Sequence, residues 1–215
     1  MTFFEFFAQN RADVLDATVE HAVLVLEGLG LAVLIGLPVA VLTYRTGYPR
    51  AAVLGVAGLL LTIPSYALFG LLITPLGLGN GPSIVALTLY ALLPVLRNAI
   101  VGLREVDPAV TESARAMGMG RLRILTTVEL PLAWPVVLAG LRVATQLLLS
   151  IAAIAAAVNG PGLGNLILDG LATAGTPFAV YLTLEGAAGI VVLAVLFELL
   201  FAAVNRLTTP RGLGA

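Results

Sequence analysis

The chain has 215 residues, of which 60% are hydrophobic and 11% are charged, and its mean hydropathy is +1.06. This balance is typical of a polytopic membrane protein and argues against a soluble domain. The formal net charge of −1 gives no indication of a nucleic-acid-binding surface, and the lack of cysteine excludes disulfides, thiol catalysis and cysteine-based metal sites.

The amino-terminal segment, residues 1–18, carries two pairs of Phe beside acidic and basic side chains. It predicts either a short amphipathic helix that lies in the membrane interface or a frayed terminus. Because it has neither a basic start nor a small-residue cleavage site, we expect no removable signal peptide.

Five apolar runs follow, and each is longer than the ~20 residues that a helix needs to cross a bilayer. The runs are Val19–Tyr44, Ala51–Ile73, Ser83–Leu103, Leu132–Val158 and Phe178–Val204. Pro38, Pro64 and Pro94 fall within the first three and are expected to kink them. The predicted fold class is therefore all-α, a polytopic membrane protein with five transmembrane helices.

The distribution of arginine predicts the orientation of these helices, since basic residues concentrate in cytoplasmic connections. The first and third connections and the C-terminal tail contain Arg, whereas residues 74–82 and 159–177 contain no basic residue. We therefore expect the N-terminus outside and the C-terminus in the cytoplasm. The predicted parts are an external or interfacial segment 1–18, a transmembrane domain 19–204 with a cytoplasmic loop 105–131, and a cytoplasmic tail 205–215.

The third connection, DPAVTESARAMGMGRLRILTTVELP, is the most polar stretch between two apolar runs. Asp107 is a good N-cap and Pro108 suits the first helical position, so a short helix is expected to begin there. It should end near Gly118 and Gly120, and a second short helix should follow from Arg121 to Val128. Ala114 and Gly118 are four residues apart, which predicts one face on which another backbone or side chain could approach closely.

This spacing resembles the EAA loop of ABC importer permeases, which is Glu-Ala-Ala, three residues, Gly, nine residues and Ile-x-Leu-Pro. Here the loop reads Glu112-Ser113-Ala114, then Gly118, then Val128-Glu129-Leu130-Pro131. The resemblance implies a coupling helix that docks into a separate cytoplasmic ATPase, which would bind the ATP, so that this chain needs no cofactor. It implies coupling roles for Glu112, Ser113, Ala114, Arg115, Gly118, Leu130 and Pro131. The bland alternative is an ordinary cytosolic loop of good helix formers.

Four further blocks resemble permeases for glycine betaine, carnitine, choline or proline. They are IPSYALFGLL, ALLPVLRNAIVGLREVDPA, MGMGRLRILTTVELPLAWPVVLAGLRVAT and NGPGLGNLI. The resemblance implies the type I (MetI-like) ABC importer permease fold in the cell inner membrane. It also implies a second permease subunit, identical or homologous, and a substrate-binding protein outside. Asn165 departs from the family, whose members tend to have Asp there.

Charged and aromatic residues within the apolar runs are the candidates for a translocation pathway, because intramembrane charges are costly. Glu27 and Glu185 could attract a quaternary ammonium group, and aromatic rings could offer cation–π contacts. The candidates are Glu27, Tyr66, Phe69, Tyr90 and Glu185. Arg97 and Arg142 are more simply explained by snorkelling or by pairing with Glu198 or Glu105.

The sequence contains no catalytic constellation and no metal-ligand set. His21 has no nucleophile beside it and is interpreted as an interfacial side chain at the outer end of the first helix. The alternatives that stay open are a permease for an amino acid such as methionine and, from other classes, a membrane-embedded enzyme or a secondary transporter. The last would be expected to show inverted repeats, which the sequence does not.

Overall fold

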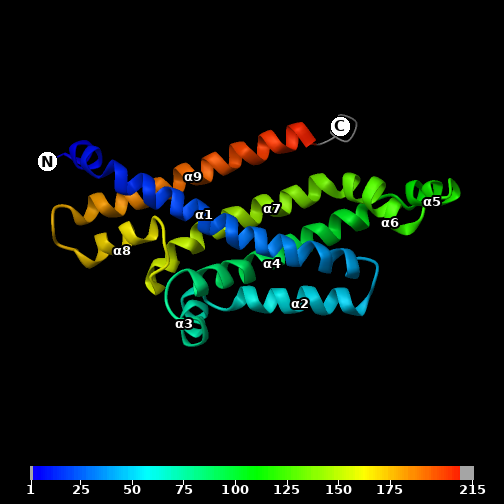
Figure 1. The fold of residues 1–215 in the computed structure, drawn as a ribbon, viewed down its shortest axis with the longest axis horizontal. Coiled ribbons are helices and arrows are strands. Elements are labelled where there is room, and N and C mark those ends of the chain that lie inside the picture. Colours follow the sequence, from blue (N-terminus) through cyan, green and yellow to red (C-terminus); the bar gives the residue numbers. More distant parts are fainter. Residues whose placement is uncertain (1, 209–215) are drawn as a thin grey trace.

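Helices form the regular structure of residues 2–208, the part of the chain that the computed structural model describes (Figure 1). The α-helices are α1 (Phe3–Thr43), α2 (Tyr48–Thr62), α3 (Ser65–Leu76), α4 (Asn80–Glu105), α5 (Pro108–Ala116), α6 (Arg121–Ile124), α7 (Leu130–Ala152), α8 (Gly164–Ala172) and α9 (Ala179–Thr208). A π-helix, η1 (Leu125–Glu129), precedes α7, and a 3-10 helix, η2 (Ala153–Val158), follows it. We name the two ends of the molecule after α5 and α8, which lie at opposite ends in Figure 1.

Helix α1 is longer than a bilayer requires. Its 41 residues correspond to about 60 Å, against a hydrocarbon core of ~30 Å. A capping box starts it, in which the Thr2 and Glu5 side chains each bond the other residue's backbone N–H. The first turns pack on the start of α9, where the Phe6 ring stacks on Phe178 at 5.5 Å. Residues 3–18 are therefore neither a separate short helix nor a frayed terminus, because they are the first turns of α1. Their place outside or in the membrane interface stays a prediction.

The second apolar run does not form one kinked helix as predicted. It breaks between Thr62 and Ser65, and the two halves, α2 and α3, meet at 98°. Pro64 has no N–H to continue the helix and pushes Ile63 into an extended conformation (φ −66°, ψ 127°). The Tyr90 hydroxyl then donates to the freed Ile63 carbonyl at 2.7 Å. The described residues contain four helices long and apolar enough to span a membrane, or five if the bent pair counts as one span.

Close packing of α1, α4 and α7 forms the centre of the molecule, and small residues allow it. Gly28 of α1 lies against Leu87 of α4, so that a Cβ on Gly28 would come within 2.7 Å of the Leu87 Cβ. Gly140 of α7 is tighter still, since a Cβ there would lie 2.4 Å from the Asn98 Cβ. Helices α4 and α7 therefore meet nearly backbone to backbone, and this contact fixes the position of the loop between them.

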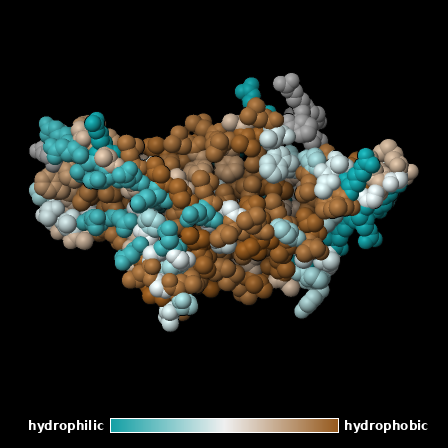
Figure 2. Space-filling model, viewed as in Figure 1, coloured by the Kyte–Doolittle hydropathy of each residue, from teal (hydrophilic) through white to brown (hydrophobic). Residues whose placement is uncertain are grey.

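The surface has an apolar band between two polar ends. Figure 2 shows hydrophobic residues across the middle of this face and hydrophilic residues towards both ends. Much of the band consists of fully or largely exposed Leu and Val side chains, for example Leu34, Val191 and Leu199. Such exposure is unfavourable in water and normal in lipid. Trp134 lies near the α5 end and donates its indole N–H to Thr208 at 2.7 Å.

Candidate functional site

Helix α5 begins and ends as its sequence predicts. The Asp107 carboxylate accepts the Ala109 N–H at 2.8 Å, and Pro108 occupies the first helical position, where its missing N–H costs nothing. The helix ends at Ala116, with the basic Arg115 in its last turn, where a cation favours the helix dipole. The predicted short helix of the loop is thus confirmed.

Gly118 ends α5 because its backbone has a positive φ of +84°. The following residue, Met119, donates its N–H to the Ala114 carbonyl at 3.1 Å, and Gly118 donates to Arg115 at 2.9 Å. A Cβ on Gly118 would meet no atom within 4 Å. Backbone conformation, and not lack of space within the chain, therefore favours glycine here.

The two sides of α5 differ in burial. Thr111 and Ala114 face the rest of the chain, and Ala114 is only 2% exposed. The close approach predicted for the face of Ala114 and Gly118 occurs at Ala114, which packs inward, whereas Gly118 lies beyond the end of the helix. The predicted coupling residues Glu112, Ser113 and Arg115 are all exposed.

Large apolar side chains lie exposed beside these polar ones. Met117 is 71% and Leu122 is 73% exposed, and Val110 is also exposed. We call the exposed residues Val110, Glu112, Ser113, Arg115, Met117 and Leu122 the loop surface. A small surface that mixes a carboxylate, a guanidinium and apolar side chains has the composition of a docking site for another protein.

The second predicted helix of the loop is not separate from the membrane helix. The segment from Arg121 onward runs through α6 and the π-helix η1 directly into α7, whose first two residues are Leu130 and Pro131. Pro131 cannot donate to the carbonyl of Thr127 four residues back, and its ring crowds that carbonyl. A widened π-turn at this point accommodates the proline.

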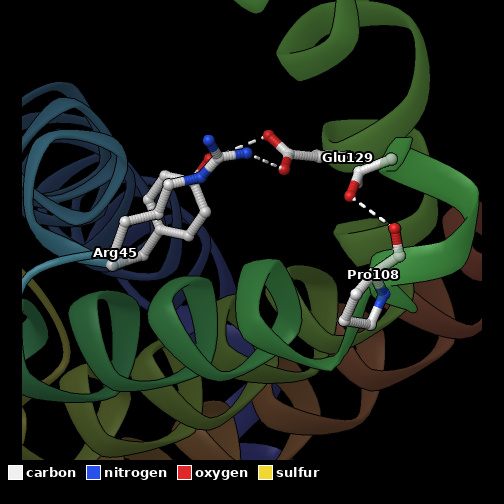
Figure 3. A network of polar contacts seen from close by, with 5 residues as sticks. Arg45, Pro108 and Glu129 are labelled. Carbon is white, nitrogen blue, oxygen red and sulfur yellow. Dashed lines mark hydrogen bonds and ion pairs between the residues drawn. The ribbon is translucent and has the colours of Figure 1, made fainter. Parts of the chain in front are cut away.

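Glu129, the last residue of η1, is the buried carboxylate of an ion pair whose arginine, Arg45, is half-exposed. It is 3% exposed and accepts the Tyr44 hydroxyl at 2.8 Å on one oxygen. Its other oxygen accepts the Arg45 guanidinium, as Figure 3 shows. Tyr44 and Arg45 follow the last residue of α1, so this carboxylate joins the α1–α2 turn to the start of α7.

Glu129 lies within the loop motif, but the sequence predicts no role for it. Burial, and the hydrogen bond and negative charge of Glu129, raise the pKa of Tyr44 to about 12. The phenol is therefore a hydrogen-bond donor at any physiological pH. The signal that could have found this pair was the presence of opposite charges on two connections predicted to lie on the same side.

The five pathway candidates do not gather in one place. Phe69 and Tyr90 are 1% and 2% exposed and belong to the central apolar core. Tyr66, on the same short helix as Phe69, is 65% exposed, and Glu27 on α1 is exposed as well. Glu185 is 2% exposed within α9. Within this chain the candidates therefore line no common cavity.

The comparison with protein families decides the class of the protein. Residues 32–210 match the family described as "Binding-protein-dependent transport system inner membrane component". This chain belongs to that permease family.

Relatives of the permease match it over nearly their whole length. It is 38% identical to the osmoprotectant import permease protein OsmW of Salmonella typhimurium, over 95% of each chain. It is 33% identical to the glycine betaine/carnitine/choline permease protein OpuCB of Bacillus subtilis, over 97% of this chain and 94% of the relative. It is 34% identical to the choline permease protein OpuBB of the same organism, over 97% and 94%.

Solved structures confirm the fold of the permease. A chain of the inward-facing MetNI methionine ABC transporter superposes with a TM-score of 0.80 at 22% identity, covering 91% of this chain and 96% of that one. A chain of an amino acid ABC transporter solved with histidines superposes with a TM-score of 0.72 at 18% identity, covering 96% of this chain and 97% of that one. The predicted type I importer fold is thus confirmed. The family match confirms the expected transport subunit and its multi-pass place in the inner membrane. In this family ATP is handled by a partner ATPase.

Two smaller predictions about the permease had opposite outcomes. Arg142 pairs with Glu198, its Nε donating at 2.7 Å, which confirms structural pairing as the simpler interpretation. His21 is fully buried and its Nε2 lies 3.1 Å from the Leu149 carbonyl, so its interpretation as an interfacial side chain was wrong. Hydropathy gave its depth along α1 but not the side of the helix on which it lies.

The glycine-rich segment at residues 159–165 packs against the same part of α1. Gly162 donates its N–H to Glu20 at 3.2 Å, and the Asn165 side-chain amide donates to the Gly160 and Gly162 carbonyls. A Cβ on Gly162, whose φ is +111°, would lie 2.9 Å from His21. Residues 159–165 therefore form a tight turn packed against α1.

Proposed function

We propose that this permease is the transmembrane subunit of an ATP-driven importer for quaternary ammonium osmoprotectants, of which glycine betaine, choline and carnitine are the candidates. The observation that carries the proposal is similarity of 33–38% over nearly the full length to permeases named for these compounds. The methionine importer shares the fold, but at 22% identity that likeness carries no argument about substrate.

The proposed coupling contact is the loop surface together with Gly118. Glu112 lies near the N-terminal turn of α5 and can meet a basic residue of the ATPase, while Met117 and Leu122 offer apolar contacts. Closure of the ATPase on bound ATP would then displace α5, and α5 is covalently continuous with α4 and α7. Leu130 and Pro131 are part of the proposed coupling region because they are the first two residues of α7.

The transport pathway is proposed to lie between this chain and a second permease, identical or homologous, because Tyr66 and Glu27 lie exposed on the outer surface of this chain. An external binding protein would deliver the substrate and carry most of the specificity. Glu27, Tyr66, Phe69, Tyr90 and Glu185 stay candidates for contacts along the pathway. Since Phe69 and Tyr90 are core residues, Tyr66 and Glu27 are the two that can reach substrate without rearrangement.

The proposed orientation has the N-terminus and the α8 end outside and the α5 end in the cytoplasm. Arg45, Arg50, Arg104, Arg115, Arg121, Arg123 and Arg206 support it, since all of them belong to connections or helix ends on the α5 side. The chain has no cysteine, so single-cysteine labelling is clean. We expect Ser113→Cys to resist an impermeant maleimide in intact cells and to react after the membrane is opened. Reaction from outside would invert the orientation.

The proposed function is tested by uptake. The permease is expressed with the ATPase and binding protein encoded beside it, in cells that lack their own osmoprotectant uptake. We expect uptake of labelled glycine betaine, choline or carnitine to exceed that of an ATPase-inactive control by about tenfold or more, a difference of ~1.4 kcal/mol in barrier. Labelled methionine should stay at background. Uptake of methionine with none of the three quaternary amines would replace the proposal with the amino-acid alternative.

A further inference from the structure

The Glu129 carboxylate connects two parts of the permease that the chain does not connect directly. Tyr44 and Arg45 belong to the turn after α1, and Glu129 lies 85 and 84 residues further along. Within residues 2–208, no other side-chain hydrogen bond joins this turn to the segment from Arg121 to Leu130. The pair is buried at the carboxylate, where water cannot replace it, and a buried charge that loses its partner is strongly destabilising.

A displacement of α5 reaches α4 and α7 through covalent connections, whereas α1 has no such connection to α5. Residues 106 and 107 connect it to α4, and residues 117–120 connect it to α6, which continues into α7. Helix α1 is followed by α2 and has no covalent link to the loop. At the α5 end, Ala40 and Tyr44 also pack in one apolar cluster with residues of α4 and α7. The bonds of Glu129 to Tyr44 and Arg45 add directional, charged contacts to that packing, through which a displacement of the loop can reach the end of α1.

The bonds of Glu129 to Tyr44 and Arg45 depend on the conformation of the π-helix η1, in which Glu129 is the last residue. In η1 the Leu130 N–H donates to Leu125, five residues back, and the Thr127 hydroxyl donates to the Arg123 carbonyl at 2.6 Å. A π-turn holds one residue more than an α-turn and is less stable, so it persists where other contacts favour it. Conversion to an α-turn would rotate the residues on one side of it by about 100°, which would turn Glu129 away from Arg45.

We propose that Glu129 is a positioning residue for energy coupling: held by Tyr44 and Arg45, it fixes the π-turn before α7 and makes α1 move together with the α5 loop. The role rests on the proposed function, since the motion it transmits is that of an ATP-driven importer. Pro131 permits the π-turn, and the ion pair selects it. The start of α5 at Pro108 is drawn beside this network in Figure 3.

The first test measures the geometry and requires no substrate. Tyr48 is 86% exposed, and Ala116, the last residue of α5, is exposed outside the loop surface. They lie on either side of the link, and both can carry a spin label as cysteine variants of a chain without native cysteine. The labelled permease is diluted with unlabelled permease, assembled with its ATPase in nanodiscs and studied by double electron–electron resonance. We expect one narrow distance distribution for the parent and a broadened or two-peaked distribution after Glu129→Gln.

The matched control is Glu198→Gln, which removes the carboxylate of the exposed ion pair with Arg142 and should leave the Tyr48–Ala116 distribution unchanged. An unchanged distribution after Glu129→Gln would overturn the proposal. So would equal broadening in the control, because the effect would then not be specific to this link.

The second test separates positioning from mere stability by a double variant. Glu129→Gln alone leaves the Arg45 charge without its partner, whereas Glu129→Gln with Arg45→Met removes both charges. We expect the double variant to regain normal assembly with the ATPase but to carry about tenfold less substrate per ATP hydrolysed, within the usual range of coupling effects. A double variant with the parent ratio would show a structural role only. Failure of the parent to transport any quaternary amine would refute the proposed function, and the distance measurement would still decide the role of Glu129.

Discussion

Replacement of Gly118 by Val is expected to abolish uptake while the permease stays inserted in the membrane. Gly118 has φ +84°, a conformation that costs an ordinary residue ~1–2 kcal/mol and a β-branched residue more. The cheapest relief is to redirect the chain after Met117, which changes the angle between α5 and α6 and displaces the loop surface. We expect the ATPase no longer to co-purify with the variant, and uptake of labelled glycine betaine to fall to background.

Gly118→Asn is the matched control, because Asn adopts positive φ more readily than other residues and there is space for its side chain. It should retain a large part of both ATPase binding and uptake. Glu112→Ala should lower uptake only modestly, since one exposed charge is worth ~1 kcal/mol or less. If Gly118→Val bound the ATPase and transported as the parent does, the geometry at the end of α5 would be irrelevant to coupling.

Replacement of Gly140 by Val is expected to prevent folding of the helical core. Even the Cβ would lie 2.4 Å from the Asn98 Cβ and 2.9 Å from the Pro94 carbonyl oxygen, which is backbone and cannot swing aside. Helices α4 and α7 must then separate, at a cost of ~3 kcal/mol or more. We expect little monodisperse protein after solubilisation, and a clearly lower melting temperature for any that remains.

Gly58 in α2 provides the control for that experiment. It is also a glycine in an apolar helix, but a Cβ there would meet no atom within 4 Å. Gly58→Val should therefore fold, with yield and melting temperature close to those of the parent. Equal behaviour of the two variants would mean that the contact between α4 and α7 is looser than the structure has it.

The predictions that succeeded rest on residues close to each other in the sequence. Asp107 and Pro108 fix the start of α5 and Gly118 fixes its end, because capping and positive φ depend on residues within one turn. The transmembrane class follows from hydropathy alone. These features need no knowledge of what packs against them.

Predictions failed where a distant residue decides the outcome. A proline in a membrane helix can kink it or break it, and at Pro64 the Tyr90 hydroxyl stabilises the break from 27 residues away. Glu129 gained its role from Tyr44 and Arg45, more than eighty residues earlier. The five pathway candidates stay predictions, because the sequence indicates how deep a residue lies in the membrane but not which surface it faces. For this reason the sequence could not predict that Phe69 and Tyr90 lie in the core.

The hydrogen bond from Tyr90 to the Ile63 carbonyl also bears on how a mutational scan of this permease should be interpreted. Removing the hydroxyl leaves a backbone acceptor at the corner between α2 and α3 without its donor, so transport can fall for every substrate alike. A scan for cation–π contacts would record that loss as substrate recognition. Tyr90→Phe keeps the aromatic ring and removes only the donor. Uptake lost on Tyr90→Phe is therefore caused by the missing hydrogen bond to the Ile63 carbonyl between α2 and α3. Only a further change in uptake on Tyr90→Leu indicates a role of the aromatic ring.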